Sequence, residues 1–187
     1  PIPGSNLPSV IGWRTIDDTN KMIEIAQTKK RAVVIGGGLL GLECARGLLD
    51  QGMEVTVLHL ADWLMEMQLD RKAGEMLKAD LEKQGMKIEL QANSKEIIGD
   101  KDVEAIKLAD GRVIETDLVV MAVGIRPYTE VAKDSGLDVN RGIVVNDYMQ
   151  TSDSHIYAVG ECAEHDGKVY GLVAPLYEQG KVLADPL

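Results

Sequence analysis

The stretch that decides the fold reads Ala32-Val33-Val34-Ile35-Gly36-Gly37-Gly38-Leu39-Leu40-Gly41. Its first four residues form a short, continuous apolar run rich in β-branched side chains, which is typical of a central parallel strand buried on both faces. Residues 39–50 follow with apolar side chains at helical spacing, and Gln51-Gly52 supplies a helix exit. The glycines therefore lie in a turn that joins a buried strand to a helix.

This turn, Gly36-Gly37-Gly38-Leu39-Leu40-Gly41, fits the pattern GxGxxG. In dinucleotide-binding folds the first glycine permits a tight turn, the second lets the backbone approach a pyrophosphate, and the third lets the helix lie close to the strand. Free amides at the start of the helix then bind the phosphates. A glycine-rich turn without a ligand is the alternative, but the surrounding strand, helix and second strand favour NAD(P)H binding at residues 36–41.

Strands and helices alternate over the first two thirds of the chain. Further strands are predicted at four places: residues 55–58, residues 86–90, residues 94–115 as two or three short antiparallel strands, and residues 118–121. Helices are predicted to start near Asp17 and at Asp70. This order predicts an α/β fold, a Rossmann-like doubly wound NAD(P)-binding domain with an antiparallel β-meander. We expect this domain to span residues 15–124, after a linker or extended lead-in over residues 1–14.

The pattern changes after Gly124. Residues 142–145 and 156–159 read as short strands, and a closing helix is predicted from Pro175 to Leu183. The second strand delivers Gly160-Glu161 at its carboxyl end, where ligands of α/β sheets bind. On spacing alone, a buried strand followed by an exposed acid explains these residues equally well.

Composition limits the function classes. Of 187 residues, 45% are hydrophobic and 27% are charged, which excludes disordered and collagen-like chains. The formal net charge of −10, with no basic stripe, disfavours nucleic-acid binding and docking on anionic membranes. No apolar run reaches the roughly 18 residues of a spanning helix and no signal peptide is visible, so we expect a cytoplasmic protein. Cys44 and Cys162 show neither a CxxC pattern nor metal-ligand spacing, so no metal site is predicted.

The acidic residue expected about 20 positions after the glycine turn is missing. The second predicted strand ends instead at His59. A neutral imidazole can make one donor and one acceptor contact with the adenosine ribose, whereas an imidazolium would attract a 2′-phosphate. An ordinary residue at the end of a strand is the other interpretation. The choice between NADH and NADPH therefore stays open, with Arg71 and Lys72 available to assist NADPH.

Several segments resemble a known family. Asp117-Leu118-Val119-Val120-Met121-Ala122-Val123-Gly124 and the Gly160-Glu161 turn, together with the GxGxxG turn, are similar to the pyridine-nucleotide-disulfide-type FAD/NAD(P)H oxidoreductases. More narrowly, three stretches resemble the flavoprotein part of the large subunit of assimilatory NAD(P)H nitrite reductases: residues 59–66, 140–145 and 159–179.

The resemblance implies that residues 125–187 are the C-terminal portion of a split FAD-binding domain whose N-terminal half is absent from this chain. In the family, the strand-glycine-acid segment holds the flavin ribityl chain, usually through Asp, and Glu161 takes that place here. Gly124 and Gly160 are implied cofactor contacts. Ala174-Pro175-Leu176 would face the flavin pyrimidine edge at the start of the last helix.

The resemblance also implies a catalytic position. Glu43, on the helix after the glycine turn, corresponds to a glutamate near the contact between flavin and nicotinamide. A solvated helix residue is the other interpretation of Glu43.

The family relationship implies hydride transfer from NAD(P)H to FAD and electron transfer onward to iron–sulfur and siroheme centres. Two cysteines cannot ligate a four-iron cluster, so we expect those centres outside this chain and the chain alone to be inactive. Because the chain begins with Pro1-Ile2-Pro3, we expect a fragment whose partners are the missing N-terminal FAD half and C-terminal electron-acceptor domains. An NAD(P)H:rubredoxin or ferredoxin reductase and a non-enzymatic dinucleotide-binding module are the alternatives, and a homodimer is left open.

Overall fold

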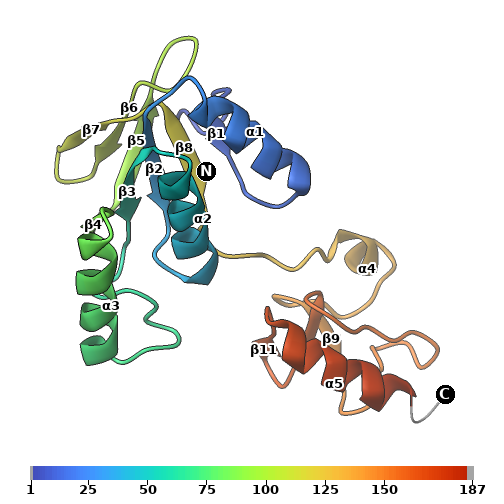
Figure 1. The fold of residues 1–187 in the computed structure, drawn as a ribbon. Helices are drawn as coiled ribbons and strands as arrows, with labels where there is room; N and C mark the ends of the chain where they lie inside the picture. The colour runs from blue at the N-terminus through green and yellow to red at the C-terminus, as the bar shows by residue number, and fades with distance from the viewer. Residues whose placement is uncertain (1, 185–187) are drawn as a thin grey trace. The chain divides into compact units, whose positions relative to one another are not determined.

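A computed structural model describes residues 2–184, and Figure 1 shows its secondary structure. Pro1 of the predicted lead-in and residues 185–187 of the predicted second domain lie outside the described residues. The chain divides into two compact units, Pro1–Gly124 and Ile125–Leu187. None of the helices found between residues 2 and 184 is long and apolar enough to cross a membrane.

A parallel sheet of five strands forms the centre of the first unit, in the order β1-β8-β2-β3-β4 (Figure 1). Its strands are β1 (Val10–Ile11), β2 (Arg31–Ile35), β3 (Glu54–Leu58), β4 (Lys87–Glu89) and β8 (Leu118–Met121). The middle strand, β2, has a neighbour on each side, and Val33 and Val34 are buried on its opposite faces. The α/β fold class and the burial of the deciding strand are therefore confirmed.

Three helices belong to this unit: α1 (Ile16–Ala26), α2 (Leu39–Asp50) and α3 (Arg71–Lys83). Helix α1 begins with a capping box, in which Thr15 and Asp18 each accept a hydrogen bond from the other's backbone amide. Asp70 is the N-cap of helix α3, as predicted, and its carboxylate accepts a hydrogen bond from Ala73 N at 2.8 Å. Helix α2 differs because its N-cap, Gly38, has no side chain to offer.

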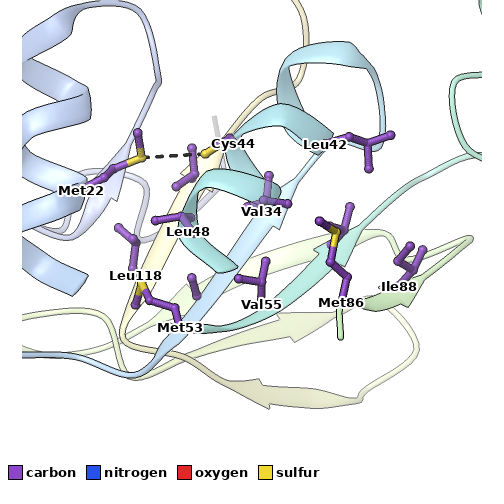
Figure 2. Packing of buried hydrophobic residues seen from close by; sticks show 14 of the residues in the cluster. Met22, Val34, Leu42, Cys44, Leu48, Met53, Val55, Met86, Ile88 and Leu118 are labelled. Atoms are coloured by element: carbon purple, nitrogen blue, oxygen red, sulfur yellow. Dashed lines mark hydrogen bonds between the residues drawn. The ribbon is translucent and has the colours of Figure 1, made fainter. Parts of the chain in front are cut away.

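Helix α2 packs its apolar side against one face of the sheet (Figure 2). Leu42 and Leu48 lie over the sheet residues Val34 and Val55 in one buried cluster. Each such leucine contributes roughly 1.5–3 kcal/mol by leaving water. The Cys44 thiol contacts Met22 Sδ of α1 at 3.8 Å, and burial raises the pKa of Cys44 to about 11. Cys44 is therefore a packing residue that joins two helices.

An antiparallel meander covers the opposite face of the sheet. Its strands are β5 (Ser94–Ile98), β6 (Ala105–Leu108) and β7 (Val113–Glu115), and the order β5-β6-β7 confirms the predicted meander. The turn between the last two strands closes with a hydrogen bond from Gly111 N to Leu108 O at 3.1 Å. Ile97 and Ile106 of the meander share a buried cluster with Val33 and Val119 of the sheet.

The lead-in differs from the predicted linker because it is part of this unit. Ile2 and Leu7 pack against the cluster beneath the meander, and Ile97 N donates a hydrogen bond to Pro3 O at 2.9 Å. Farther on, β1 adds a parallel edge strand beside β8. The proline and glycine content of this segment indicated its turns, but not the apolar side chains between them that anchor it.

The second unit contains a small sheet in the order β11-β10-β9. Its elements are α4 (Glu130–Asp134), β9 (Ile143–Val145), β10 (Ala163–His165), β11 (Lys168–Val169) and α5 (Val173–Ala184). The strand predicted over residues 156–159 is reduced to one bridge between Tyr157 and Gln150. This segment folds back on residues 149–151, where Thr151 N donates to Ile156 O at 2.9 Å and Ala158 N donates to Met149 O at 3.0 Å.

An ion pair at the amino ends of β2 and β8 gives a test of the first unit's stability. The Asp117 carboxylate accepts hydrogen bonds from the Arg31 guanidinium, at 3.0 Å from Nη2, and this lowers the pKa of Asp117 to about 2. We expect Asp117→Asn to lower the free energy of unfolding by about 2 kcal/mol at pH 7. Because the folded pKa lies below the unfolded one, this stabilisation is complete above about pH 4 and is lost as the pH falls toward 2.

Urea denaturation at pH 7 and pH 3 measures this difference, with the exposed Asp100→Asn as the control. The difference in unfolding free energy between Asp117→Asn and the parent should be smaller at pH 3 than at pH 7. The control variant should have the same unfolding free energy as the parent at pH 7. A gap that is equally large at both pH values would contradict the assignment.

Candidate functional site

The glycine turn lies between the end of β2 and the start of α2, and at two of its glycines a side chain would overlap the backbone. Gly36 has a φ of +121°, and a Cβ atom there would lie 2.3 Å from the carbonyl oxygen of Ala122. A Cβ atom on Gly41 would lie 1.9 Å from the carbonyl oxygen of Gly36. Because these residues have no side chain, the first turn of α2 can lie directly against the carboxyl ends of β2 and β8.

Gly38 has different surroundings. A Cβ atom placed on it would meet no other atom within 4 Å, so the backbone here faces open space. Leu42 N donates the first helical hydrogen bond, to Gly38 O at 3.0 Å. Within residues 2–184, the amides of residues 38–41 donate to no acceptor of the protein. Four donors at the positive end of α2 are therefore available to an anion.

The remaining glycine of the turn, Gly37, binds the side chain at the end of β3. Its amide donates to His59 Nδ1 at 3.0 Å, and His59 Nε2 lies 2.9 Å from a carboxylate oxygen of Glu66. Because Nδ1 accepts, the neutral imidazole carries its proton on Nε2 and donates it to Glu66. His59 is only 7% exposed, and both of its ring nitrogens have protein partners. The residue predicted to touch the ribose therefore joins the glycine turn to Glu66.

Two further predicted residues of the first unit lie near the carboxyl end of the sheet. The Gly124 carbonyl accepts a hydrogen bond from Arg14 Nη2 at 3.0 Å, and Gly124 faces open space. Glu43 is exposed on the first turns of α2, and its carboxylate accepts no hydrogen bond from the described part of the chain. The contact from Arg14 had no signal in the sequence.

In the second unit, the Gly160-Glu161 turn is tied to the last helix. Gly160 N donates to Gln179 Oε1 of α5 at 2.8 Å, and Gln179 is buried. Glu161 is exposed. Residues 174–176 lie in the first turn of α5, which begins at Val173, before the predicted start at Pro175. Gln179 was not predicted, because nothing in the spacing marks a helical glutamine as the partner of a distant glycine.

The cations suggested as partners for NADPH, Arg71 and Lys72, are the first two residues of α3, and both are exposed. Arg71 pairs with Asp62, lies 4.8 Å from the centre of the Trp63 ring, and reaches Glu75 at 3.8 Å. Arg71 is therefore held between two carboxylates and a ring.

Comparison with known proteins places the chain in a family. Residues 1–180 match the model of the family described as pyridine nucleotide-disulphide oxidoreductase. The chain is 61% identical over 184 residues to a nitrite reductase [NAD(P)H] of Bacillus subtilis, covering 98% of the chain and 23% of the relative. It is 50% identical over 184 residues to an assimilatory nitrate reductase electron transfer subunit of the same organism. This match covers 98% of the chain and 24% of the relative.

A solved structure, an NAD-dependent persulfide reductase from A. fulgidus, superposes with a TM-score of 0.93 at 32% identity, over all of this chain and 36% of that one. The chain thus spans about a quarter of the length of the two curated relatives. With its family model, its close relatives and its fold in agreement, the chain belongs to the pyridine nucleotide-disulphide oxidoreductase family.

Proposed function

We propose that residues 36–41 bind the pyrophosphate of NAD(P)H. One observation carries this proposal: the amides of residues 38–41 have no protein acceptor among residues 2–184 and adjoin the open space at Gly38. Backbone amides at a helix start suit a pyrophosphate because they offer several donors and the positive end of the helix dipole. A side chain at Gly38 would occupy the space that the phosphates need.

The net charge of −10 does not oppose this binding. Charges farther away than the Debye length of about 8 Å are largely screened at physiological ionic strength. Each contact at the helix end contributes about 0.3–1 kcal/mol at short range. The local donors therefore outweigh the distant carboxylates.

For the second unit we propose a share of an FAD site. Glu161 is exposed beside a turn that Gln179 holds in place, so its carboxylate is free to accept hydrogen bonds from ribityl hydroxyls. The amides of Ala174 and Leu176 lie in the first turn of α5, where amides have no helical acceptor. These donors would stabilise negative charge on the flavin pyrimidine. We also propose Gly124 as a cofactor contact and Glu43 as a catalytic residue near the contact between flavin and nicotinamide.

The proposed activity belongs to the whole protein. FAD, when bound, would supply the redox chemistry that links a two-electron hydride donor to one-electron acceptors. We propose a nitrite reductase large subunit, because the nitrite reductase is the more similar of the two curated relatives, at 61% against 50% identity. Its iron–sulfur and siroheme centres and the other half of the flavin site would lie in partner domains. An electron transfer subunit for a nitrate reductase is the second candidate, and nitrite consumption by the whole protein separates the two.

Titration of NADH and NADPH into this chain, followed by nicotinamide fluorescence, tests the binding proposal. We expect saturation with a Kd between about 1 μM and 1 mM, the common range for enzyme substrates. ADP should compete with NADH, because ADP carries the diphosphate, whereas adenosine should compete far less. Absence of saturable binding, or equal competition by adenosine, would overturn the proposal.

A further inference from the structure

A carboxylate from another segment, that of Glu66, lies close to the end of β3. Dinucleotide-binding folds place an acid here that accepts hydrogen bonds from the adenosine ribose and repels a 2′-phosphate. In this chain β3 ends at His59, and a carboxylate oxygen of Glu66 lies 2.9 Å from His59 Nε2. The imidazole ring of His59 therefore lies between the end of β3 and the Glu66 carboxylate.

The loop that carries Glu66 is fixed to the glycine turn. Met65 N donates to Gly37 O at 3.0 Å, while Gly37 N donates to His59 Nδ1. Leu64 is fully buried directly beneath Gly37, where a Cβ atom would lie 2.6 Å from the leucine side chain. Glu66 is thus the neighbour of a residue bonded to the proposed phosphate turn.

We propose that Glu66 recognises the adenosine ribose and selects NADH over NADPH, with His59 as its positioning residue. This inference rests on the proposed binding of a dinucleotide at residues 36–41. The Glu66 side chain is 36% exposed, and its second oxygen, Oε1, makes no hydrogen bond within residues 2–184. That oxygen can accept a hydrogen bond from a ribose hydroxyl. A 2′-phosphate would be repelled by the negative charge of the Glu66 carboxylate.

The surrounding charges favour the same choice. Residues 59–75 contain four carboxylates and two cations. One of the cations, Arg71, is already bound to Asp62 and stacked on Trp63. Carboxylates therefore outnumber cations in this segment, and Arg71 is not free to pair with a 2′-phosphate.

A purely structural role for Glu66 predicts a different result. If Glu66 only oriented His59 and the glycine turn, its loss would raise the Kd of NADH and the Kd of NADPH by the same factor. If Glu66 contacts the adenosine ribose, its loss changes the ratio of the two dissociation constants. The ratio Kd(NADPH)/Kd(NADH) is therefore the quantity to measure.

The test is Glu66→Gln, measured by fluorescence titration with NADH and NADPH. Glutamine keeps an oxygen that accepts from His59 Nε2, so circular dichroism should match the parent. Because a hydrogen bond to a charged group is stronger than one to a neutral group, we expect the ratio to fall about tenfold. NADH should bind more weakly and NADPH more tightly.

Glu54→Gln is the matched control, because it removes the same charge from the opposite end of β3, at an exposed side chain. It should leave the ratio unchanged. If Glu66→Gln also leaves the ratio unchanged while NADH still binds, the inference is wrong and the proposed function stands. If the parent chain binds neither nucleotide, both are overturned.

Discussion

Gly41→Ala is expected to raise the Kd for NADH at least tenfold. A methyl group at this position would lie 1.9 Å from the carbonyl oxygen of Gly36, which is far inside van der Waals contact. Because that oxygen belongs to the backbone, helix α2 must move away from the end of β2. The displaced amides of residues 38–41 then lose their alignment on the pyrophosphate, and a loss of about 1.4 kcal/mol of binding free energy raises the Kd tenfold.

Gly47→Ala is the matched control on the same helix. A Cβ atom there meets nothing within 4 Å, so the variant should bind NADH as the parent does. It should also gain up to about 1 kcal/mol of unfolding free energy, because alanine favours helix more than glycine does. Equal Kd values for Gly41→Ala and Gly47→Ala would mean that the close approach of α2 to β2 does not matter for binding.

The second large effect separates the roles of Gly36 and Gly38. Gly36→Ala places a side chain at a φ of +121° and 2.3 Å from the Ala122 carbonyl oxygen. We expect it to lower the free energy of unfolding by about 3 kcal/mol, because a strained backbone and a clash with a neighbouring strand add together. Gly38→Ala meets no atom of the protein, and it should cost less than about 1 kcal/mol of stability.

The order of effects on binding should differ from the order on stability. Gly38→Ala should weaken NADH binding about tenfold or more although the fold is kept, because its methyl group occupies the space proposed for the pyrophosphate. Urea denaturation and NADH titration of both variants measure the two quantities. A Gly38→Ala variant that binds as tightly as the parent would show that the open space at Gly38 is not used by the ligand.

Much of the first unit follows from local patterns in the sequence. The bounds of α2, the cap of α3 at Asp70 and the meander over residues 94–115 are each determined by neighbours in the chain. Helical spacing, a capping carboxylate and a glycine turn each depend on only a few consecutive residues. They can therefore be recognised from the sequence. The parallel sheet then follows from the order of strands and helices.

The features that escaped prediction depend on contacts between distant segments. The lead-in is anchored because Ile2 and Leu7 pack against the buried cluster beneath the meander. No local sequence pattern indicates this long-range contact. The same applies to Gln179, which holds Gly160 from another element. At the site, His59 was identified as the residue at the end of β3, but its buried ring and its bond to Glu66 required the path of the loop over residues 60–69.

The proposed binding of a dinucleotide pyrophosphate by the amides at the start of α2 can be observed residue by residue. An amide nitrogen–proton correlation NMR spectrum of the chain, recorded during an NADH titration, follows each of these amides. We expect saturable shifts that are largest at Gly38, Leu39, Leu40 and Gly41, which have no acceptor within residues 2–184. Saturable shifts centred elsewhere, with these four amides unchanged, would contradict it.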